Sequence, residues 1–155
     1  MSYTAIAQSV DGGVRQEVDV NGRHILTTDE PASLGGTDTA PTPHELLAAA
    51  LASCVSTMIM LYARRRDWDL GEVRVEVRYD ADSTPRGVDV TVHLPAGLTP
   101  GQIERLERVA ATCPVRRALE VGFTFDERLI TDLPAPAALP LQAVSKPWPG
   151  SKPDG

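Results

Sequence analysis

Hydrophobic and polar residues alternate in two separate parts of the chain. In residues 14–29, VRQEVDVNGRHILTTD, the pair Asn21-Gly22 stands between two extended runs, which is the strongest short-range signal for a β-hairpin. Downstream, valines alternate with polar or charged residues over 73–79 and again over 88–94. A period of two is typical of strands with one buried face, so we expect two more strands there.

A run without any charged side chain lies between these parts, over residues 46–63. Just before it, Thr42 is a favourable N-cap, Pro43 suits the first helical position, and Glu45 completes a T-x-x-E capping box. The pattern therefore predicts a long helix that follows a loop rich in glycine, proline and threonine.

A second capping box, TPGQ at residues 99–102, predicts a shorter helix. The apolar stripe of this helix consists of Ile103, Leu106, Ala110 and Cys113. Pro114 breaks or restarts the helix. A last strand is expected in GFTFDERLI, residues 122–130.

The order of these elements is strands, long helix, two strands, helix and strand. It indicates an α+β fold in which antiparallel sheets pack on a long central helix. We expect residues 1–131 to form a single domain. Residues 132–155 contain six prolines and no periodicity, so they are interpreted as a proline-rich C-terminal tail.

The chargeless run has three interpretations: a membrane span, a buried structural helix, or the surroundings of a reactive site. Its length approaches that of a membrane span. However, alanine, serine and threonine fill much of it, and small residues allow close packing by neighbouring protein segments. We therefore expect no membrane contact and a helix buried on most sides. A single chain of this size covers such a helix poorly, which indicates a homodimer.

Composition excludes several classes of function. The formal net charge is −6 over 155 residues, whereas nucleic-acid binding needs a concentrated basic face. The N-terminus lacks the pattern of a secretory signal, and two cysteines are too few for a disulfide scaffold, so we expect a cytoplasmic protein. No C-x-x-C pair or histidine spacing suggests a metal site, and we expect no bound cofactor.

The two cysteines can be core residues or reactive thiols. Unpaired cysteine is among the most buried residue types, and Cys54 shares a helix face with Leu47 and Met58. Cys113 lies where Pro114 would start a new helical turn, and a helix N-terminus lowers the pKa of a thiol. The residues alone leave both interpretations open for each cysteine.

The segment GGTDTAPTPHELLAAALASC, followed far downstream by CPVRRAL, resembles the OsmC/Ohr family of thiol peroxidases. The preceding GRHILTTDEPASLGG resembles its YhfA-like OsmC branch. The P-x-E-L-L run, nine residues before the first cysteine, and the later C-P-V carry this resemblance. The similarity covers residues 15–130 and implies an OsmC-like fold and an intertwined homodimer with two sites at the subunit interface.

The resemblance also implies an activity and residue roles. Members reduce small organic hydroperoxides to alcohols in defence against oxidative stress. By this resemblance Cys54 is the peroxidatic cysteine, Cys113 resolves the sulfenic acid through an intramolecular disulfide, and an external dithiol reductant restores the pair. Glu45 matches the family's glutamate, whose partner is an arginine near the thiol. Arg23 is our first choice for that arginine and Arg15 our second.

Helix geometry constrains Glu45. Nine residues separate it from Cys54, so the two side chains project from opposite faces about 13 Å apart along the axis. We expect Glu45 to serve Cys54 only across a dimer interface or through an intervening arginine.

Two further classes of function compete with a hydroperoxide reductase. One is a dimer that binds a small apolar ligand and uses both cysteines for packing. The other is a general thiol redox protein that exchanges disulfides without meeting peroxide. A reactive Cys54/Cys113 pair separates the ligand-binding dimer from both redox functions, and the arginine helps to separate those two.

Overall fold

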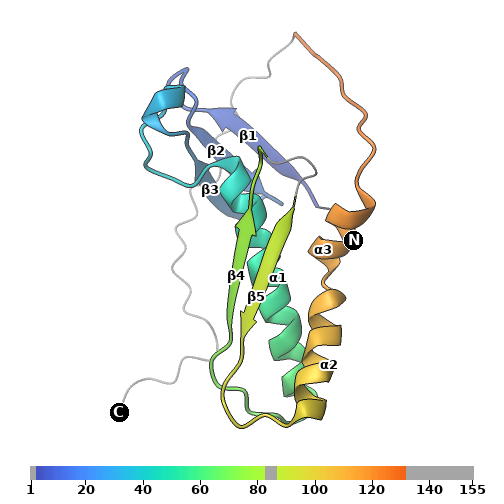
Figure 1. Cartoon of the computed structure of the whole chain (residues 1–155). Coiled ribbons are helices and arrows are strands. Elements are labelled where there is room, and N and C mark those ends of the chain that lie inside the picture. Colours follow the sequence, from blue (N-terminus) through green and yellow to red (C-terminus); the bar gives the residue numbers. More distant parts are fainter. Residues whose placement is uncertain (1–2, 83–86, 132–155) are drawn as a thin grey trace, which may run out of the picture. The chain divides into compact units, whose positions relative to one another are not determined.

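The computed structural model describes residues 3–82 and 87–131 (Figure 1). These residues form two compact units, one of residues 3–40 with 128–131 and one of residues 41–82 with 87–127. Antiparallel sheets and a long helix confirm the α+β class. The single domain over 1–131 stays a prediction, and the tail at 132–155 lies outside the described residues.

The first unit is a three-stranded antiparallel sheet of β1 (Ala5–Ser9), β2 (Gln16–Val20) and β3 (His24–Thr28), in the order β1-β2-β3. The hairpin predicted from Asn21-Gly22 is confirmed, because β2 pairs with β3 and both turn residues have positive φ angles of 56° and 65°. The carboxylate of Asp19 accepts the Gly22 N–H at 2.8 Å and fixes this turn.

A short 3₁₀ helix, η1 (Ala32–Leu34), follows β3 and ends at Gly35 in the left-handed conformation. The loop then folds back on itself, since the Asp38 N–H donates to the carbonyl of Glu30 at 3.1 Å. Gly36 lies so close to Glu30 that any Cβ at this position would overlap the Glu30 backbone. The Gly35-Gly36 pair therefore permits a tight return of the chain that larger residues would block.

The second unit begins with α1 (Pro43–Arg64). Its predicted capping box is confirmed: Thr42 Oγ1 accepts the Glu45 N–H at 3.2 Å, and Glu45 Oε2 accepts the Thr42 N–H at 2.7 Å. Such a cap stabilises a helix by about 1 kcal/mol.

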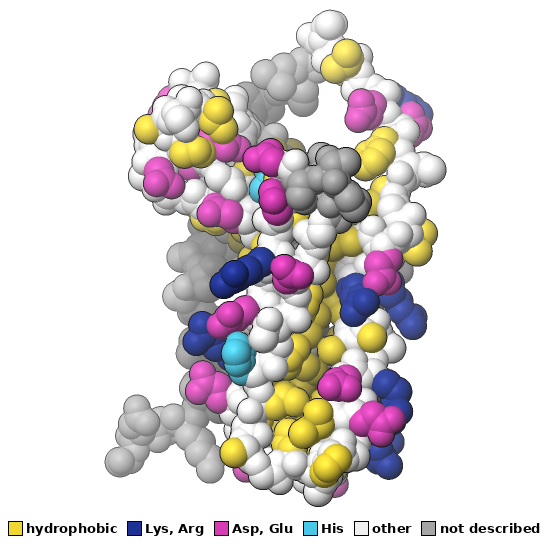
Figure 2. All heavy atoms as spheres, in the orientation of Figure 1, with side chains coloured by type: hydrophobic (Ala, Val, Ile, Leu, Met, Phe, Trp, Pro, Cys, Tyr) yellow, Lys and Arg dark blue, Asp and Glu magenta, His cyan; other side chains and the backbone are white. Residues whose placement is uncertain are grey.

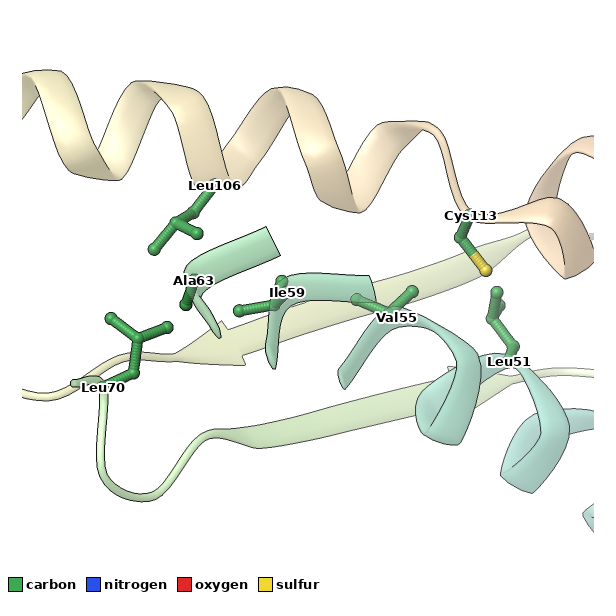
Figure 3. Close-up of a cluster of buried hydrophobic side chains, with 7 residues drawn as sticks. All are labelled: Leu51, Val55, Ile59, Ala63, Leu70, Leu106 and Cys113. Carbon is green, nitrogen blue, oxygen red and sulfur yellow. The ribbon is translucent and has the colours of Figure 1, made fainter. Parts of the chain in front are cut away.

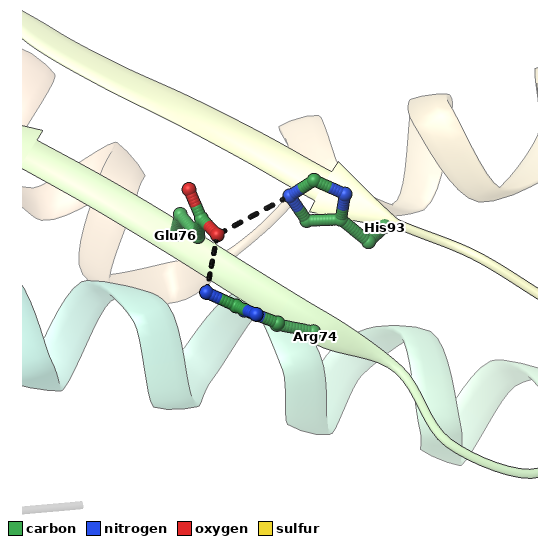
Figure 4. Close-up of polar contacts among 3 residues, drawn as sticks. All are labelled: Arg74, Glu76 and His93. Carbon is green, nitrogen blue, oxygen red and sulfur yellow. Dashed lines mark ion pairs between the residues drawn. The ribbon is translucent and has the colours of Figure 1, made fainter.

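The predicted strands of the second unit form the antiparallel hairpin of β4 (Arg74–Tyr79) and β5 (Val88–His93), which packs on α1 through β4. On its outer face Glu76 contacts Arg74 at 2.6 Å and His93 at 3.5 Å (Figure 4). All three side chains are solvent-exposed, so these ion pairs add little stability.

The core of the second unit joins α1 to α2 (Pro100–Ala111) and α3 (Pro114–Val121). The capping box at Thr99 and Gln102 and the restart at Pro114 are both confirmed. The fully buried cluster is shown in Figure 3 and consists of Leu51, Val55, Ile59, Ala63, Leu70, Leu106 and Cys113.

One chain leaves much of α1 uncovered, as expected for a long apolar helix in a chain of this size, and burial of the rest by a partner stays a prediction. The buried residues of α1 recur every fourth position and form one stripe, while Met60 and Leu61 remain 39% and 43% exposed. The hairpin of β4 and β5 and the helices α2 and α3 together cover this one side of α1. With a mean hydropathy of 2.0, α1 is long and apolar enough to cross a membrane by length and composition, but its buried stripe belongs to the protein core.

The last strand predicted at residues 122–130 is absent, because this segment has neither helix nor strand. The two phenylalanines of this segment, Phe123 and Phe125, are 66% and 80% exposed. A strand needs a neighbour for its backbone hydrogen bonds, and no strand in the described part of this chain pairs with the segment.

Candidate active site

Cys113 is placed by the break between α2 and α3. Pro114 has no N–H to donate and occupies the first turn of α3, which leaves Cys113 as the N-cap residue. Its side chain is completely buried, and Figure 3 shows the sulfur pointing toward α1 near Leu51 and Val55. The same proline that ends one helix thus directs this thiol into the core.

Cys54 meets that thiol from α1. It precedes the buried Val55, is itself half-buried, and packs against the core cluster that contains Cys113, close enough for the two thiols to interact. Both cysteines are free thiols. Two residues 59 positions apart in the sequence are therefore held together by the packing of α3 on α1.

Three influences act on the ionisation of Cys54. Burial raises the pKa of its thiol, the neighbouring Cys113 raises it further, and the backbone N–H of Val115 lowers it by donating to the sulfur. The sequence suggested that the N-terminus of α3 would act on Cys113, whereas the structure directs this N–H at Cys54. Within the described residues, none of the groups that shift the Cys54 pKa is a cation.

Glu45 lies away from Cys54. Because α1 is continuous, their separation by nine positions places the two side chains on opposite faces. Glu45 is exposed, serves the capping box, and lines a hollow with His44, Arg78 and Tyr79. A role for Glu45 toward Cys54 stays a prediction.

The two candidate arginines both belong to the first unit, in different surroundings. Arg23 lies in the turn between β2 and β3, is exposed, and has no side-chain hydrogen bond or ion pair with any described residue. Arg15 lies just before β2, and its Nη1 donates to Thr39 Oγ1 at 3.3 Å. The structure therefore fixes the head group of Arg15 and not that of Arg23.

Asp29 is a residue of interest that the sequence interpretation missed. It follows β3, is 1% exposed, and accepts hydrogen bonds from the loop that leads to α1. The side chain of Thr37, then the backbone of Glu30 and both donors of Thr39, hold the pKa of this carboxyl far below its usual range, against the opposing effect of burial. The available signal in the sequence was the pair Thr37 and Thr39, two hydroxyl donors in a loop that also contains Gly35-Gly36.

The second unit also has an apolar groove of about 340 Å³, and neither cysteine is among the residues that line it. It is lined by residues of α1, β5 and α2, including Val55, Val92 and Leu106. Figure 2 shows hydrophobic side chains gathered along it. Among the described residues, no three histidine, cysteine or acidic side chains come close enough to hold a metal ion.

Comparisons with known proteins place this geometry in context. A family model described as OsmC-like protein matches residues 36–128, which include both cysteines and Glu45. The comparison with curated proteins found no match.

Several solved structures are similar to this chain. An osmotic stress induced and detoxification response protein from Psychrobacter arcticus has 27% identity and a TM-score of 0.64, with 76% of this chain and 88% of that chain covered. An organic hydroperoxide resistance protein OsmC from Legionella pneumophila has 28% identity and a TM-score of 0.58, with coverages of 77% and 89%. An organic hydroperoxide resistance protein from Vibrio cholerae has 26% identity and a TM-score of 0.54, with coverages of 77% and 84%.

Proposed function

This chain belongs to the OsmC-like protein family, and we propose that it reduces organic hydroperoxides to alcohols with a pair of cysteines. The observation that carries the proposal is the close approach of the half-buried Cys54 to the buried Cys113. Similar proteins from Legionella and Vibrio are named for organic hydroperoxide resistance, which supports the same class of reaction here. The setting we propose is defence against oxidative stress in the cytoplasm, where thiols stay reduced.

The proposed chemistry needs two steps and a reductant. The Cys54 thiolate attacks one oxygen of ROOH; the O–O bond breaks, the departing RO⁻ takes a proton to become ROH, and Cys54 becomes a sulfenic acid. The Cys113 thiol then attacks that sulfur, releasing water and forming the Cys54–Cys113 disulfide. An external dithiol, oxidised in turn to its own disulfide, returns both cysteines to thiols. No bound cofactor takes part in this sequence.

The arrangement suits these steps. Resolution requires a second thiol within reach of the first, and the packing of α3 on α1 supplies it without a large rearrangement. The Val115 N–H that donates to the Cys54 sulfur would also stabilise negative charge there. Apolar residues beside Cys54 favour an organic hydroperoxide over hydrogen peroxide as the substrate.

Activation of Cys54 requires a further group. Burial and Cys113 both favour the protonated thiol, and one backbone N–H opposes them. A nearby cation would restore the thiolate. We place Arg15 before Arg23 in this role, because Thr39 fixes the head group of Arg15 and no described residue fixes that of Arg23. Glu45 is proposed as a second partner of that arginine.

We also propose that the working form is a homodimer. The exposed apolar residues of α1, and the exposed phenylalanines of the segment 122–130, which forms no strand, are surfaces that a second copy could cover. A second copy would cover the free face of α1 and offer strand edges to the segment. Such a partner would supply what the absent last strand lacks.

A stoichiometric assay tests the proposed reaction. Reduced protein, mixed with less than one equivalent of an alkyl hydroperoxide, should consume all of it and form an equal amount of alcohol. Intact-mass measurement should show the loss of two hydrogens in the fraction that reacted. An inert protein with unmodified thiols would instead favour a dimer that binds an apolar ligand. Disulfide exchange without peroxide consumption would favour a general thiol redox protein.

The dimer is tested by sedimentation equilibrium of the reduced protein. The wild type should sediment at twice the mass of one chain, and Leu61→Asp should shift it toward single chains, because a charge on the free face of α1 cannot be buried without a partner. Arg105→Gln, on the exposed side of α2, changes the net charge by the same −1 and should leave the dimer intact. A wild type that sediments as a single chain would contradict the proposal.

A further inference from the structure

We propose that a hollow between the end of α1 and the outer face of α2 binds a small molecule through its phosphate group. The hollow belongs to the second unit, has a volume of about 390 Å³, and is lined by Tyr62, Arg66, Arg105, Arg108, Val109 and Thr112. Three of these six residues are arginines and none is acidic, in a chain whose formal net charge is −6. Because neither cysteine lines the hollow, the proposal is independent of the peroxide chemistry.

One stripe of α2, ending at its C-cap, supplies four of the lining residues. They stand at relative positions i, i+3, i+4 and i+7, which are neighbours on a helix surface, and are Arg105, Arg108, Val109 and Thr112. Leu106 is buried and points toward α1, which fixes the rotation of α2 about its own axis (Figure 3). The two arginines of this stripe therefore remain exposed and border the same hollow.

The end of α1 supplies the other wall, beside α2 (Figure 1). Tyr62 lies in the last turn of α1, and its ring meets the ring of Trp68 edge-on, with 5.8 Å between the centroids. The guanidinium of Arg66 lies over the Tyr62 ring, 5.3 Å from its centroid. This cation–π contact holds Arg66 in place and leaves its positive charge uncompensated.

The role of a helix cap does not account for Arg66. A cation beyond the end of a helix can balance the helix dipole by bonding to the last carbonyl groups. The C-cap of α1 is Arg65, however, and among the described residues the Arg66 side chain donates no hydrogen bond to a carbonyl of α1. Its guanidinium is directed along the Tyr62 ring to the hollow instead.

The positive charges around the hollow are only partly compensated. Arg108 Nη1 contacts Glu104 Oε1 at 2.7 Å, so one arginine already has a carboxylate partner. Within residues 3–82 and 87–131, neither Arg66 nor Arg105 forms an ion pair. Two guanidinium groups without a carboxylate partner, and a third that shares one, make this hollow a site for an anion.

The number of arginines favours phosphate over carboxylate. A guanidinium binds either anion through two parallel hydrogen bonds. One arginine is enough for a carboxylate, whereas the oxygens of a doubly charged phosphate can accept from several. The volume of about 390 Å³ lies within the range of small-molecule pockets, about 300–1,000 Å³. It leaves room for more than one phosphate, with Tyr62 and Val109 as apolar contacts for the rest of the ligand.

Calorimetric titration of the reduced full-length protein with inorganic pyrophosphate tests the site at physiological ionic strength. The wild type should bind one pyrophosphate per chain, and Arg105→Gln should raise Kd about tenfold or more, the value of a hydrogen bond to a charged group. Arg117→Gln is the matched control, because this exposed arginine of α3 does not line the hollow. It should stay within about twofold of the wild type, since solvent screens distant charges.

A substitution that strengthens binding separates a specific site from a loss of folding. Glu104→Gln frees Arg108 and should lower Kd by about two- to fivefold, the value of a surface ion pair. Glu120→Gln breaks the equivalent pair with Arg116 on α3 and changes the net charge equally, so it should leave Kd unchanged. Equal effects of the two substitutions would overturn the proposal, and so would a wild type without saturable pyrophosphate binding.

Discussion

Replacing Cys54 by serine is expected to abolish catalytic hydroperoxide reduction, with a loss of about 1,000-fold or more in kcat/KM. A serine hydroxyl is hardly ionised near neutral pH. It also has no sulfur to accept the peroxide oxygen, so no sulfenic acid can form. The substitution is nearly isosteric, and Cys54 is only half-buried, so the fold should persist. The rate of loss of an alkyl hydroperoxide, measured with excess dithiol, gives the result.

Cys113→Ser is the matched control for this prediction. It keeps Cys54, so one equivalent of peroxide should still be consumed and the intact mass should increase by one oxygen. Without the resolving thiol, further peroxide should over-oxidise Cys54 and turnover should decline. Full multiple turnover in Cys54→Ser would contradict the assignment of Cys54, and undiminished turnover in Cys113→Ser would contradict that of Cys113.

Local sequence signals predicted the elements of this fold well. A hairpin at Asn21-Gly22 and a capping box at Thr42 and Glu45 depend on residues within a few positions of one another, and both formed as expected. The restart at Pro114 is equally local, because proline lacks the N–H that a continuous helix needs. Each of these features forms through interactions among residues that are close together in the sequence.

Features that depend on distant partners were predicted less well. The last strand expected at residues 122–130 is absent, because pairing needs a second strand that the described residues do not provide. Likewise, the absence of charge in α1 indicates a buried helix, but it does not reveal how much of that burial a single chain provides. In both cases the sequence carries one side of an interaction and not the other.

The candidate site shows the same division. The family resemblance led to both cysteines, and the structure brings them into contact. The sequence gave no indication that the Val115 N–H would be directed at Cys54, because that depends on how α3 packs on α1. Asp29 was missed for a related reason: its importance comes from the return of the loop over it, which no short pattern describes.

Arg15→Met should lower kcat/KM for hydroperoxide reduction by about 100-fold at neutral pH, as removal of a preorganised charge partner typically does. Methionine keeps most of the length and volume of the side chain and removes the charge. Arg23→Met is the matched control and should stay within about twofold of the wild type, because no described residue holds Arg23 in place. A large loss in Arg23→Met with normal activity in Arg15→Met would reverse the assignment.

The pH dependence of the Arg15→Met defect follows from the groups that remain. Burial and Cys113 raise the pKa of the Cys54 thiol, so without a cation the thiolate is scarce at neutral pH and increases as pH rises. In the wild type, Arg15 is proposed to make the Cys54 thiol ionise at lower pH, so its alkylation rate should increase less over the same pH range. The ratio of the two rates of Cys54 alkylation by iodoacetamide, measured with Cys113→Ser in both proteins, should therefore shrink from about pH 6 to about pH 9. A ratio independent of pH would mean that Arg15 acts on something other than the ionisation of Cys54.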